Sequence, residues 1–390
     1  MSTVSVRLIR KLDELEGLRD IWDVLLKRSA SDNLFLSWEW ISTWSRVYLK
    51  GDELFVIVVY EGEEIVAIAP WWLDKQRVAG LFALRKLRFL GTGDVCSDYL
   101  DIIVDPNGHD EWLRAIWDQL FGPLRKEWDV WDYSDVPANS KALLRLYRWA
   151  DDDDRCLTRQ IKAMTICPYL NLPANEHELV ARLSGHHRYA INSSRRLLEK
   201  RGAVTFRFCE RSADVLSEMQ RLRDLNTRIW TERGHSGSFV NDNFVRFHDE
   251  VAQSMLRAGR LVLCSLRIND SHVGSFYGLQ HGHVLYYYIM SVEKSHGNRI
   301  NAGDLLLTEC MLESIRRGCL EFDFLRGDES YKYRWTQTDR RNLGLSIYNK
   351  RLGAALDIVA HSSRDAARSG AKVLARSLAA TPKNTSPQRA

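Results

Sequence analysis

The sequence predicts an α/β protein of two domains, each a mixed central sheet flanked by helices. At 390 residues the chain is long enough for two separate cores. Apolar residues recur with a period of two in some segments and of about four in others, which indicates alternating strands and helices. The order of these segments also repeats once along the chain, as two layers of roughly 170 residues would require. We therefore expect domains at 1–175 and 176–350, followed by a basic helix and disordered tail at 351–390.

The first half reads strand, two helices, strands, helix, strand, helix, strand. Val4 to Arg10 alternates as a short strand, and helices follow around residues 15–25 and 40–47. The segments LFVIVVY and IVAIAPWWL, separated by EGEE, predict a hairpin. Residues 77–86 are expected to form a basic connection. The later elements are a Gly-rich turn and strand in 87–106, a helix at 110–121, a strand at 128–136, a helix at 140–150 and a strand at 164–173.

The second half repeats this order. A basic helix at 183–201 and the strand VTFRFCE lead into helices at 215–230 and 244–258. The strands LVLCSLRI and VGSFYGL follow, and LGLSIYNK ends the half as a strand.

Between them lies the stretch that carries most of the chemistry, residues 283–335. The strand Val284 to Val292 is apolar or aromatic at almost every position, as in a strand buried on both faces. A Gly/Asn loop, a helix beginning after Gly303-Asp304, and a second strand at 320–324 complete a right-handed crossover. The loop lies at the amino end of the helix, where an anion is best held.

Composition excludes several classes of protein. The chain is 45% hydrophobic and 27% charged, has no run of the ~20 apolar residues that a membrane span needs, and begins without a secretory signal, so we expect a cytoplasmic protein. Its seven cysteines are scattered, which favours reduced thiols and no metal site. The net charge of +4 comes from the basic residues at 350–390, not from a folded face, so we do not expect nucleic acid as a partner. The basic C-terminal helix is a candidate for peripheral contact with a membrane.

Three motifs give the chain a family resemblance: FLSWEWISTW, LRFLGTGDVCSDYLDIIV and FDFLRGDESYKYRW. With them the chain resembles the GNAT acyltransferase superfamily, in particular the bacterial acetyltransferase-like proteins named after the cellulose-biosynthesis protein CelD. As a tandem pair of such domains it is also similar to the Fem-type aminoacyl transferases that build peptidoglycan cross-bridges. The resemblance implies tandem GNAT-like domains and acyl transfer from a thioester, supplied by acetyl-CoA or another acyl-CoA, to an amine.

The resemblance assigns the phosphate loop to residues 299–304. Arg299, Asn301, Ala302 and Gly303 are the cofactor-binding candidates, although Ala302 stands where the family's pattern has its first glycine. The alternative is a plain helix cap, in which Asn301 or Gly303 ends the loop and Asp304 favours the first turn. Tyr286 and Tyr288 lie on the strand that follows the pantetheine arm in this superfamily. Aromatic residues also favour central strands for structural reasons alone.

The densest polar cluster lies in and after the strand at 320–324. An attacking amine must lose a proton, and a leaving thiolate must gain one. Asp323 or Asp328 is the candidate base and Tyr331 the candidate acid. Arg326 and Lys332 are expected to partner these carboxylates or the substrate. An internal ion-pair network would gather the same residue types.

Acceptor binding is assigned to Asp98 in the first half and Arg188 on the basic helix, together with Arg326 and Lys332. A basic helix is more often a solvated face. The expected function is acyl-CoA-dependent N-acylation of a sugar or other small molecule in exopolysaccharide or cell-envelope synthesis. The alternatives are an aminoacyl-tRNA-dependent Fem-like transferase and a non-catalytic scaffold that keeps the fold.

Overall fold

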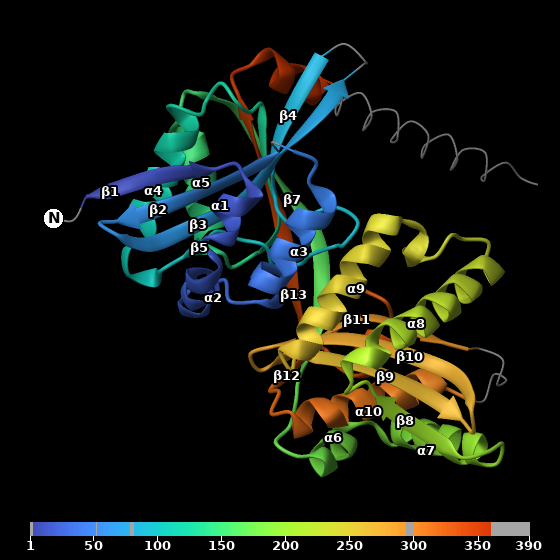
Figure 1. Ribbon diagram of the computed structural model, residues 1–390. Helices are drawn as coiled ribbons and strands as arrows, with labels where there is room; N and C mark the ends of the chain where they lie inside the picture. The colour runs from blue at the N-terminus through green and yellow to red at the C-terminus, as the bar shows by residue number, and fades with distance from the viewer. Residues whose placement is uncertain (1–2, 52, 79–81, 294–299, 360–390) are drawn as a thin grey trace, which may run out of the picture.

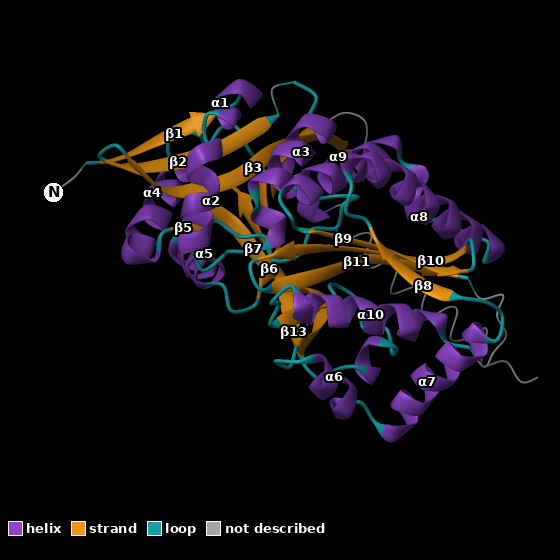
Figure 2. Cartoon of the chain, turned by 60° about the horizontal axis from the view of Figure 1, so that its bottom comes forward, coloured by secondary structure: helices purple, strands orange, loops and turns teal. Residues whose placement is uncertain are grey.

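The computed structural model describes residues 3–51, 53–78, 82–293 and 300–359, and its two halves lie one beside the other in Figure 1. Within these residues thirteen strands form one mixed sheet in the order β1-β2-β3-β4-β6-β13-β7-β12-β11-β10-β9-β8, with β5 paired to β3. Helices cover both faces of the sheet (Figure 2).

The elements of the first half follow the predicted order. They are β1 (Val4–Ile9), α1 (Leu12–Glu16), α2 (Arg19–Arg28), η1 (Leu34–Leu36), α3 (Trp38–Tyr48), β2 (Leu54–Glu61), β3 (Glu64–Val78), β4 (Phe82–Phe89), β5 (Ile103–Val104), η2 (Pro106–Gly108), α4 (His109–Phe121), β6 (Val130–Pro137), α5 (Lys141–Asp152) and β7 (Cys156–Asn171).

The second half again sets two helices before three strands. Its elements are α6 (Glu176–Arg182), α7 (Gly185–Glu199), β8 (Val204–Phe208), α8 (Ser212–Glu232), η3 (Ser238–Val240), α9 (Asp242–Arg257), β9 (Leu261–Ile268), β10 (Ser271–His281), β11 (Val284–Val292), α10 (Ala302–Arg316), β12 (Glu321–Asp323), η4 (Lys332–Arg334) and β13 (Asp339–Asn349).

Two long strands tie the halves together. Strand β7 pairs with β13 along most of its length and with β12 at its carboxyl end. Strand β13 also pairs with β6, so the last strand of the chain returns to the sheet of the first half. We had grouped this strand with residues 176–350. The boundaries at 175 and 350 stay a prediction, but the hydrogen bonding of β13 crosses them.

An aromatic contact closes the junction on one face of the sheet. Helix α3 packs against α9 (Figure 1), with the rings of Trp40 and Phe247 4.8 Å apart edge to face. Phe35 meets Tyr286 of β11 in the same way, at 5.7 Å. These side chains are almost completely buried and belong to an apolar cluster that spans both halves, while a second cluster lies within residues 172–335.

One predicted connection is a strand. Within the stretch 77–86, expected to be a basic connection, residues 77–78 end β3 and residues 82–86 belong to β4, while residues 79–81 lie outside the described residues. Three basic residues of β4 have acidic partners: Arg85 pairs with Asp129, Lys86 with Asp357 and Arg88 with Asp132 of the neighbouring strand β6. Cross-strand partners of opposite charge allow such residues into a sheet.

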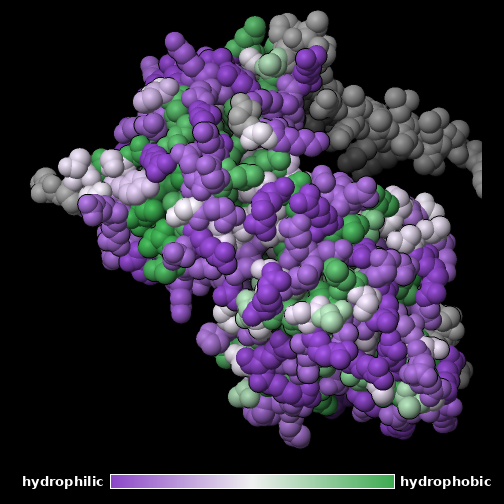
Figure 3. All heavy atoms as spheres, viewed as in Figure 1, coloured by the Kyte–Doolittle hydropathy of each residue, from purple (hydrophilic) through white to green (hydrophobic). Residues whose placement is uncertain are grey.

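Hydrophilic residues cover most of the face seen in Figure 3, and apolar residues show between them in small groups. Along the described residues, no helix combines the length and apolar character needed to span a membrane.

Candidate active site

Strands β11 and β12 run parallel for three residue pairs and then separate. Tyr286 and Asp323 form the last pair. Strand β11 continues to Val292, whereas β12 ends at Asp323. Past Tyr286, one edge of β11 therefore has no β12 partner, and the gap opens into a cavity of about 840 Å³. We call it the split cavity.

Both halves of the chain supply walls of the split cavity. The loop after β4 contributes Asp94, Cys96 and Asp98, and the α8–α9 region contributes Asn226, Trp230, Asn241 and Phe244. Residues 287–290 of β11 and the segment after β12 close the remaining sides. Polar groups are thus set into a largely apolar wall, as in most small-molecule sites.

An arginine clamp joins the halves at the base of this cavity. The guanidinium of Arg326 lies 3.0 Å from Asp98 Oδ1 and 3.2 Å from Asp135 Oδ1, and it donates to the carbonyl of Ser97 at 2.6 Å. Asp98 is fully buried and also accepts from Asn342 at 2.8 Å. Two of the four predicted substrate-binding residues, Asp98 and Arg326, are therefore brought together as partners of each other.

Backbone strain gathers around the same clamp. Among the described residues other than glycine, five have positive φ, and four of these are Cys96, Tyr99, Asp135 and Leu325. Asp135 belongs to the Asp98–Arg326–Asp135 group, and the other three lie within two residues of Asp98 or Arg326 in the sequence. Such conformations cost on the order of 1–3 kcal/mol each and cluster at functional sites.

Tyr331 and Lys332 both line the split cavity, but their side chains have different hydrogen-bond partners. The hydroxyl of Tyr331 donates to that of Tyr287 at 3.3 Å, and burial raises the pKa of Tyr331 to about 12. Lys332 is buried and its ammonium donates to the carbonyls of Leu325, Arg326 and Gly327. Tyr331 is therefore a protonated donor in the cavity, whereas Lys332 holds the loop that carries Arg326.

Glu329 was not among the predicted site residues. It lines the split cavity with a half-exposed side chain and lies 2.9 Å from Lys332. The sequence indicated Glu329 only as one of several residues in the polar cluster. Because Glu329 lies outside a strand, the alternation of side chains between two faces could not predict where it points.

Asp323 faces the other way from Tyr331. Because neighbouring residues of a strand point to opposite faces, Phe322 joins the core beneath Tyr287, and Asp323 lies beside Tyr99. Asp323 is fully buried, accepts from Tyr99 Oη at 2.8 Å and from Leu325 N at 2.7 Å, and lines neither of the two large cavities. Its desolvation raises its pKa to about 7.

Two further predicted residues lie away from the split cavity. Asp328 is exposed and does not line it. Arg188 on α7 donates to the carbonyls of Ala181 and Leu183, which close the end of α6. Asp323, Asp328 and Tyr331 were predicted to act together, but they lie on two faces of the sheet and in the solvent. The sequence pattern did not indicate in which direction each side chain points.

The tyrosines of β11 are likewise divided. Tyr286 lies on the face with Phe35 and Tyr99, away from the split cavity. Tyr288 lines the cavity and donates to the carbonyl of Val95 at 2.6 Å. Its oxygen also lies 3.1 Å from Nε2 of His248, whose pKa is lowered to about 3 by burial. Since the single proton of Tyr288 goes to Val95, Nε2 of the neutral His248 must be the donor.

The start of α10 is capped by its own side chain. Asn301 Oδ1 accepts from Asp304 N at 3.0 Å, and Asn301 N donates to Ser194 Oγ at 2.9 Å. Asp304 is buried between Arg334, at 2.8 Å, and His187, at 3.1 Å. Arg299 lies outside the described residues. The cap that we gave as the alternative is therefore present in the described part of the loop.

The helix start nevertheless adjoins the split cavity. Ala302 is buried, and a β-carbon placed on Gly303 would make an ordinary contact with Met290 Cε at 3.6 Å. Met290 lines the cavity. The positive end of the helix and the gap between the strands thus meet at Met290.

Comparison with known proteins gives this geometry a family context. Residues 185–333 match the family model described as an acetyltransferase (GNAT) domain. Among curated proteins, none matches the chain significantly. The matched segment contains α8 to α10 and β9 to β12, so it includes most of the walls of the split cavity.

Solved structures resemble the whole chain. A crystal structure of FemX is 13% identical, with a TM-score of 0.59 over 88% of this chain and 97% of that one. A conserved protein of unknown function from Bacteroides thetaiotaomicron VPI-5482 is 10% identical, with a TM-score of 0.52 over 89% and 100%. The C-terminal domain of a putative lysylphosphatidylglycerol synthetase from Agrobacterium fabrum is 10% identical, with a TM-score of 0.50 over 90% and 97%.

These comparisons confirm the predicted fold class, a mixed α/β fold of GNAT type, and the prediction of an enzyme domain of the acyltransferase class. At such low identity the solved structures establish fold alone. The narrower resemblance to the CelD-like family stays a prediction.

Proposed function

We propose that the chain is an N-acyltransferase that takes an acyl thioester into the split cavity and transfers the acyl group to a primary amine. The observation that carries the proposal is the separation of β11 from β12. It leaves strand backbone unpaired at the wall of a cavity large enough for both reactants.

The acyl carbonyl would lie in the gap between the strands. Past Tyr286 the register of β11 with β12 ends, so backbone N–H groups on that edge of β11 would be available as fixed donors to the oxyanion of a tetrahedral intermediate. The register shift opposite Tyr277 and Gly278 leaves Tyr288 as an extra residue in β11, which turns the local backbone away from a regular ladder.

Proton transfer would be divided between two residues of one segment. Tyr331 is protonated at neutral pH because its pKa is raised to about 12, so it can give a proton to the leaving thiolate. Glu329, at the cavity wall, would take the proton that the attacking amine releases, directly or through water. The amine nitrogen bonds to the carbonyl carbon, the C–S bond breaks, and no covalent enzyme intermediate forms.

Asp323 and Asp98 would then have positioning roles. Asp323 holds Tyr99, and Asp98 holds Arg326, so the loop of the first half is fixed against the second half. This assigns proton transfer to Glu329 rather than to Asp323 or Asp328, since Glu329 alone of the three lines the cavity.

The donor that fits best is an acyl-CoA. The helix start at Asn301, Ala302 and Gly303 adjoins Met290, and the carboxylate in the first turn is neutralised by Arg334. A diphosphate held there would meet the positive end of α10 without an unpaired negative charge beside it.

The direct test is binding. Acetyl-CoA and longer acyl-CoAs are expected to raise the melting temperature of the wild-type chain. Met290→Trp, which fills the gap, should keep the unliganded melting temperature within a few degrees and lose the shift. If no acyl-CoA shifts the melting temperature, or if Met290→Trp responds like the wild type, the donor site is elsewhere.

An aminoacyl-tRNA donor is the second candidate, because the FemX structure matches this chain over almost its whole length. Calorimetric titration with charged tRNA and with acetyl-CoA separates the two. Heat with charged tRNA alone would favour the Fem-like alternative. The acceptor that we propose is a sugar or another small-molecule amine of envelope or exopolysaccharide synthesis, as the CelD-like resemblance implies.

A further inference from the structure

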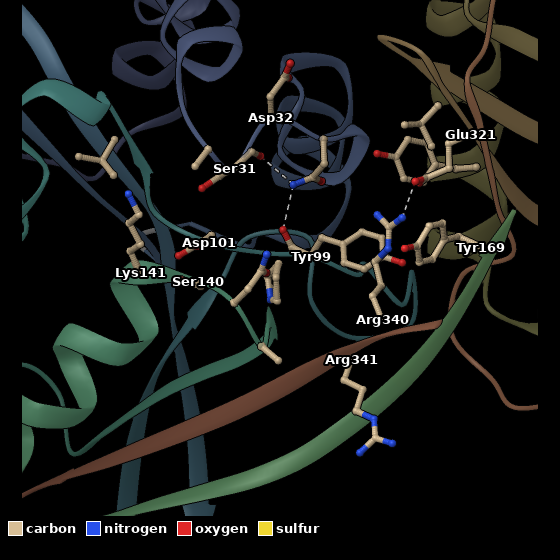
Figure 4. A pocket seen from close by; sticks show the side chains of 18 residues that line it. Ser31, Asp32, Tyr99, Asp101, Ser140, Lys141, Tyr169, Glu321, Arg340 and Arg341 are labelled. Carbon is tan, nitrogen blue, oxygen red and sulfur yellow. Dashed lines mark hydrogen bonds and ion pairs between the residues drawn. The ribbon is translucent and has the colours of Figure 1, made fainter. Parts of the chain in front are cut away.

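A second cavity, of about 700 Å³, is shown in Figure 4. We call it the tyrosine cavity. Tyr99 and Asp101 line it, whereas Asp94, Cys96 and Asp98 of the same loop line the split cavity. Residues 30–33, 99–104 and 137–141 of the first half line one side. Tyr169, Tyr286, Glu321 and Arg340 line the other. Nothing in the proposed acyl transfer uses it.

Four of the charged side chains that line the tyrosine cavity have partners within the protein. Arg340 donates to Glu321 Oε2 at 2.5 Å and lies 3.9 Å from Asp323 Oδ2. Asp32 Oδ1 lies 2.6 Å from Nε2 of His281. Asp101 accepts from the hydroxyl of Tyr133 and from the backbone of Ile102. The lining holds three acidic side chains (Asp32, Asp101 and Glu321) and three basic ones (Lys141, Arg340 and Arg341). Because these formal charges balance, the cavity offers hydrogen-bonding groups rather than a net charge to a ligand.

Aromatic rings and fixed polar groups alternate around this space. The guanidinium of Arg340 stacks 3.9 Å from the ring centre of Tyr169 and lies 5.6 Å from that of Tyr99. In Figure 4 Lys141 stands across the cavity from Glu321 and Tyr169, with Asp32 between them at the rim. Donors and acceptors on opposite walls, beside tyrosine rings, match a compact ligand that carries hydroxyl groups on several sides.

One acceptor at this wall has no partner. Within the described residues, Oε1 of Glu321 is buried without a hydrogen bond, while its Oε2 is taken by Arg340. An unpaired buried acceptor destabilises the folded state, because its desolvation is not offset by a hydrogen bond. A hydroxyl donor bound beside Glu321 would remove that cost after a small rotation of the carboxylate.

We propose that the tyrosine cavity is a binding site for a neutral saccharide, a mono- or disaccharide unit, recognised by Glu321, Arg340 and the tyrosine rings. The site is separate from the donor site, because Tyr99, Asp323 and Tyr286 stand between the two cavities. It does not depend on the proposed acyl transfer.

The test is a titration of the full-length chain, without acyl donor, with cellobiose and maltose as neutral disaccharides and with glucosamine and glucuronate as charged sugars. Saturation-transfer NMR or calorimetry reports the affinity. Glu321→Gln removes the charge that orders Arg340, and Ala138→Trp fills the cavity from its exposed wall. Glu178→Gln, a carboxylate on α6 that pairs with Arg182, is the matched control.

A neutral disaccharide is expected to bind saturably, at least about 10-fold more weakly to Glu321→Gln and to Ala138→Trp, and equally to Glu178→Gln and wild type. Because Ala138→Trp alters only the space, it stays informative if Glu321→Gln folds poorly. Binding of charged sugars alone, binding unaffected by Ala138→Trp, or no saccharide binding would overturn the proposal. None of these outcomes bears on acyl-CoA binding.

Discussion

The two halves of the chain carry the same strand–helix–strand unit, and only one of them is open. In the first half β4 runs parallel to β6 for three residue pairs, with α4 in the connection. In the second half β11 runs parallel to β12 for three pairs, with α10 in the connection. The first unit is packed with aromatic rings: Tyr133 lies 4.8 Å from Phe89 and is fully buried. The second opens into the split cavity.

The amino ends of the two helices also differ in how well they could accept an anion. Helix α4 begins with Asp110 and Glu111, which oppose an anion, and has no side-chain cap. Helix α10 begins at a capping asparagine, and its first-turn carboxylate is neutralised by Arg334. The same strand–helix–strand unit can therefore form either a closely packed structural element or a ligand-binding site. Which of the two it forms depends on the side chains that fill the gap between its diverging strands.

The largest effect should come from the acid in the open unit. Tyr331→Phe removes the proton donor while keeping the ring, so kcat should fall about 10²–10⁴-fold with KM for acetyl-CoA little changed. Tyr133→Phe, its aromatic counterpart in the packed unit, loses a hydrogen bond to Asp101 and should change stability rather than the shape of the pH–rate profile. Equal kcat for Tyr331→Phe and wild type would exclude Tyr331 as the acid.

The clamp between the halves should give the largest stability effect. Arg326→Met leaves Asp98 buried without its counter-ion and should lower the free energy of unfolding by about 3–5 kcal/mol in urea titrations. The double variant Arg326→Met/Asp98→Asn should recover part of this loss, since no buried charge then stays unpaired. A double variant less stable than the single would contradict the clamp.

Asp323 provides a pH test. Its pKa is raised to about 7 by burial, so between roughly pH 4 and 7 the folded chain keeps a proton that the unfolded chain has released. This carboxyl therefore makes folding less favourable as pH rises through that window. Compared with wild type, Asp323→Asn should gain free energy of unfolding by up to ~1.4 kcal/mol per pH unit from pH 5 to 7. Asp328→Asn, at an exposed position, is the matched control for the loss of one carboxylate.

The smallest effect concerns the helix start. Asn301→Ala removes the cap of α10 and should cost about 1 kcal/mol of stability, whereas Asn301→Asp keeps an acceptor for Asp304 N and should cost less. If the diphosphate lies there, Asn301→Asp should also weaken acetyl-CoA binding more than Asn301→Ala does, because it adds a negative charge. The reverse order of affinities would place the diphosphate elsewhere.

The sequence was most informative where periodicity and burial agree. The strand at 284–292 and the helix after it were predictable because nearly every residue of the strand is apolar and apolar residues recur at helical spacing in the helix. The helix was predicted to begin after Asp304, whereas α10 begins at Ala302, directly after the capping residue Asn301. Strand β4 was missed because its basic residues have partners as distant as Asp357. The pairing of Asp98 with Arg326, across 228 residues, leaves no local pattern at all.

The direction of single side chains was the other limit. Asp323 and Tyr331 share one polar segment, yet a strand residue and a loop residue can face opposite sides of a sheet. Glu329, Cys96 and Trp230 line the split cavity from three different elements, and only the folded chain brings them together.

Cys96 offers the most direct test of the central claim, that the acyl donor occupies the gap between β11 and β12. It lines the split cavity and is exposed, whereas the other six cysteines are buried. The surrounding protein partly desolvates the thiol of Cys96, although its surface reaches solvent, and this raises its pKa, so alkylation by iodoacetamide is best followed at about pH 8.5 by peptide mass spectrometry. In the wild type, saturating acetyl-CoA should slow the alkylation of Cys96 at least about 10-fold. In the Met290→Trp variant, acetyl-CoA should leave the rate of alkylation of Cys96 unchanged. An unchanged rate in the wild type under saturating acetyl-CoA would contradict the account.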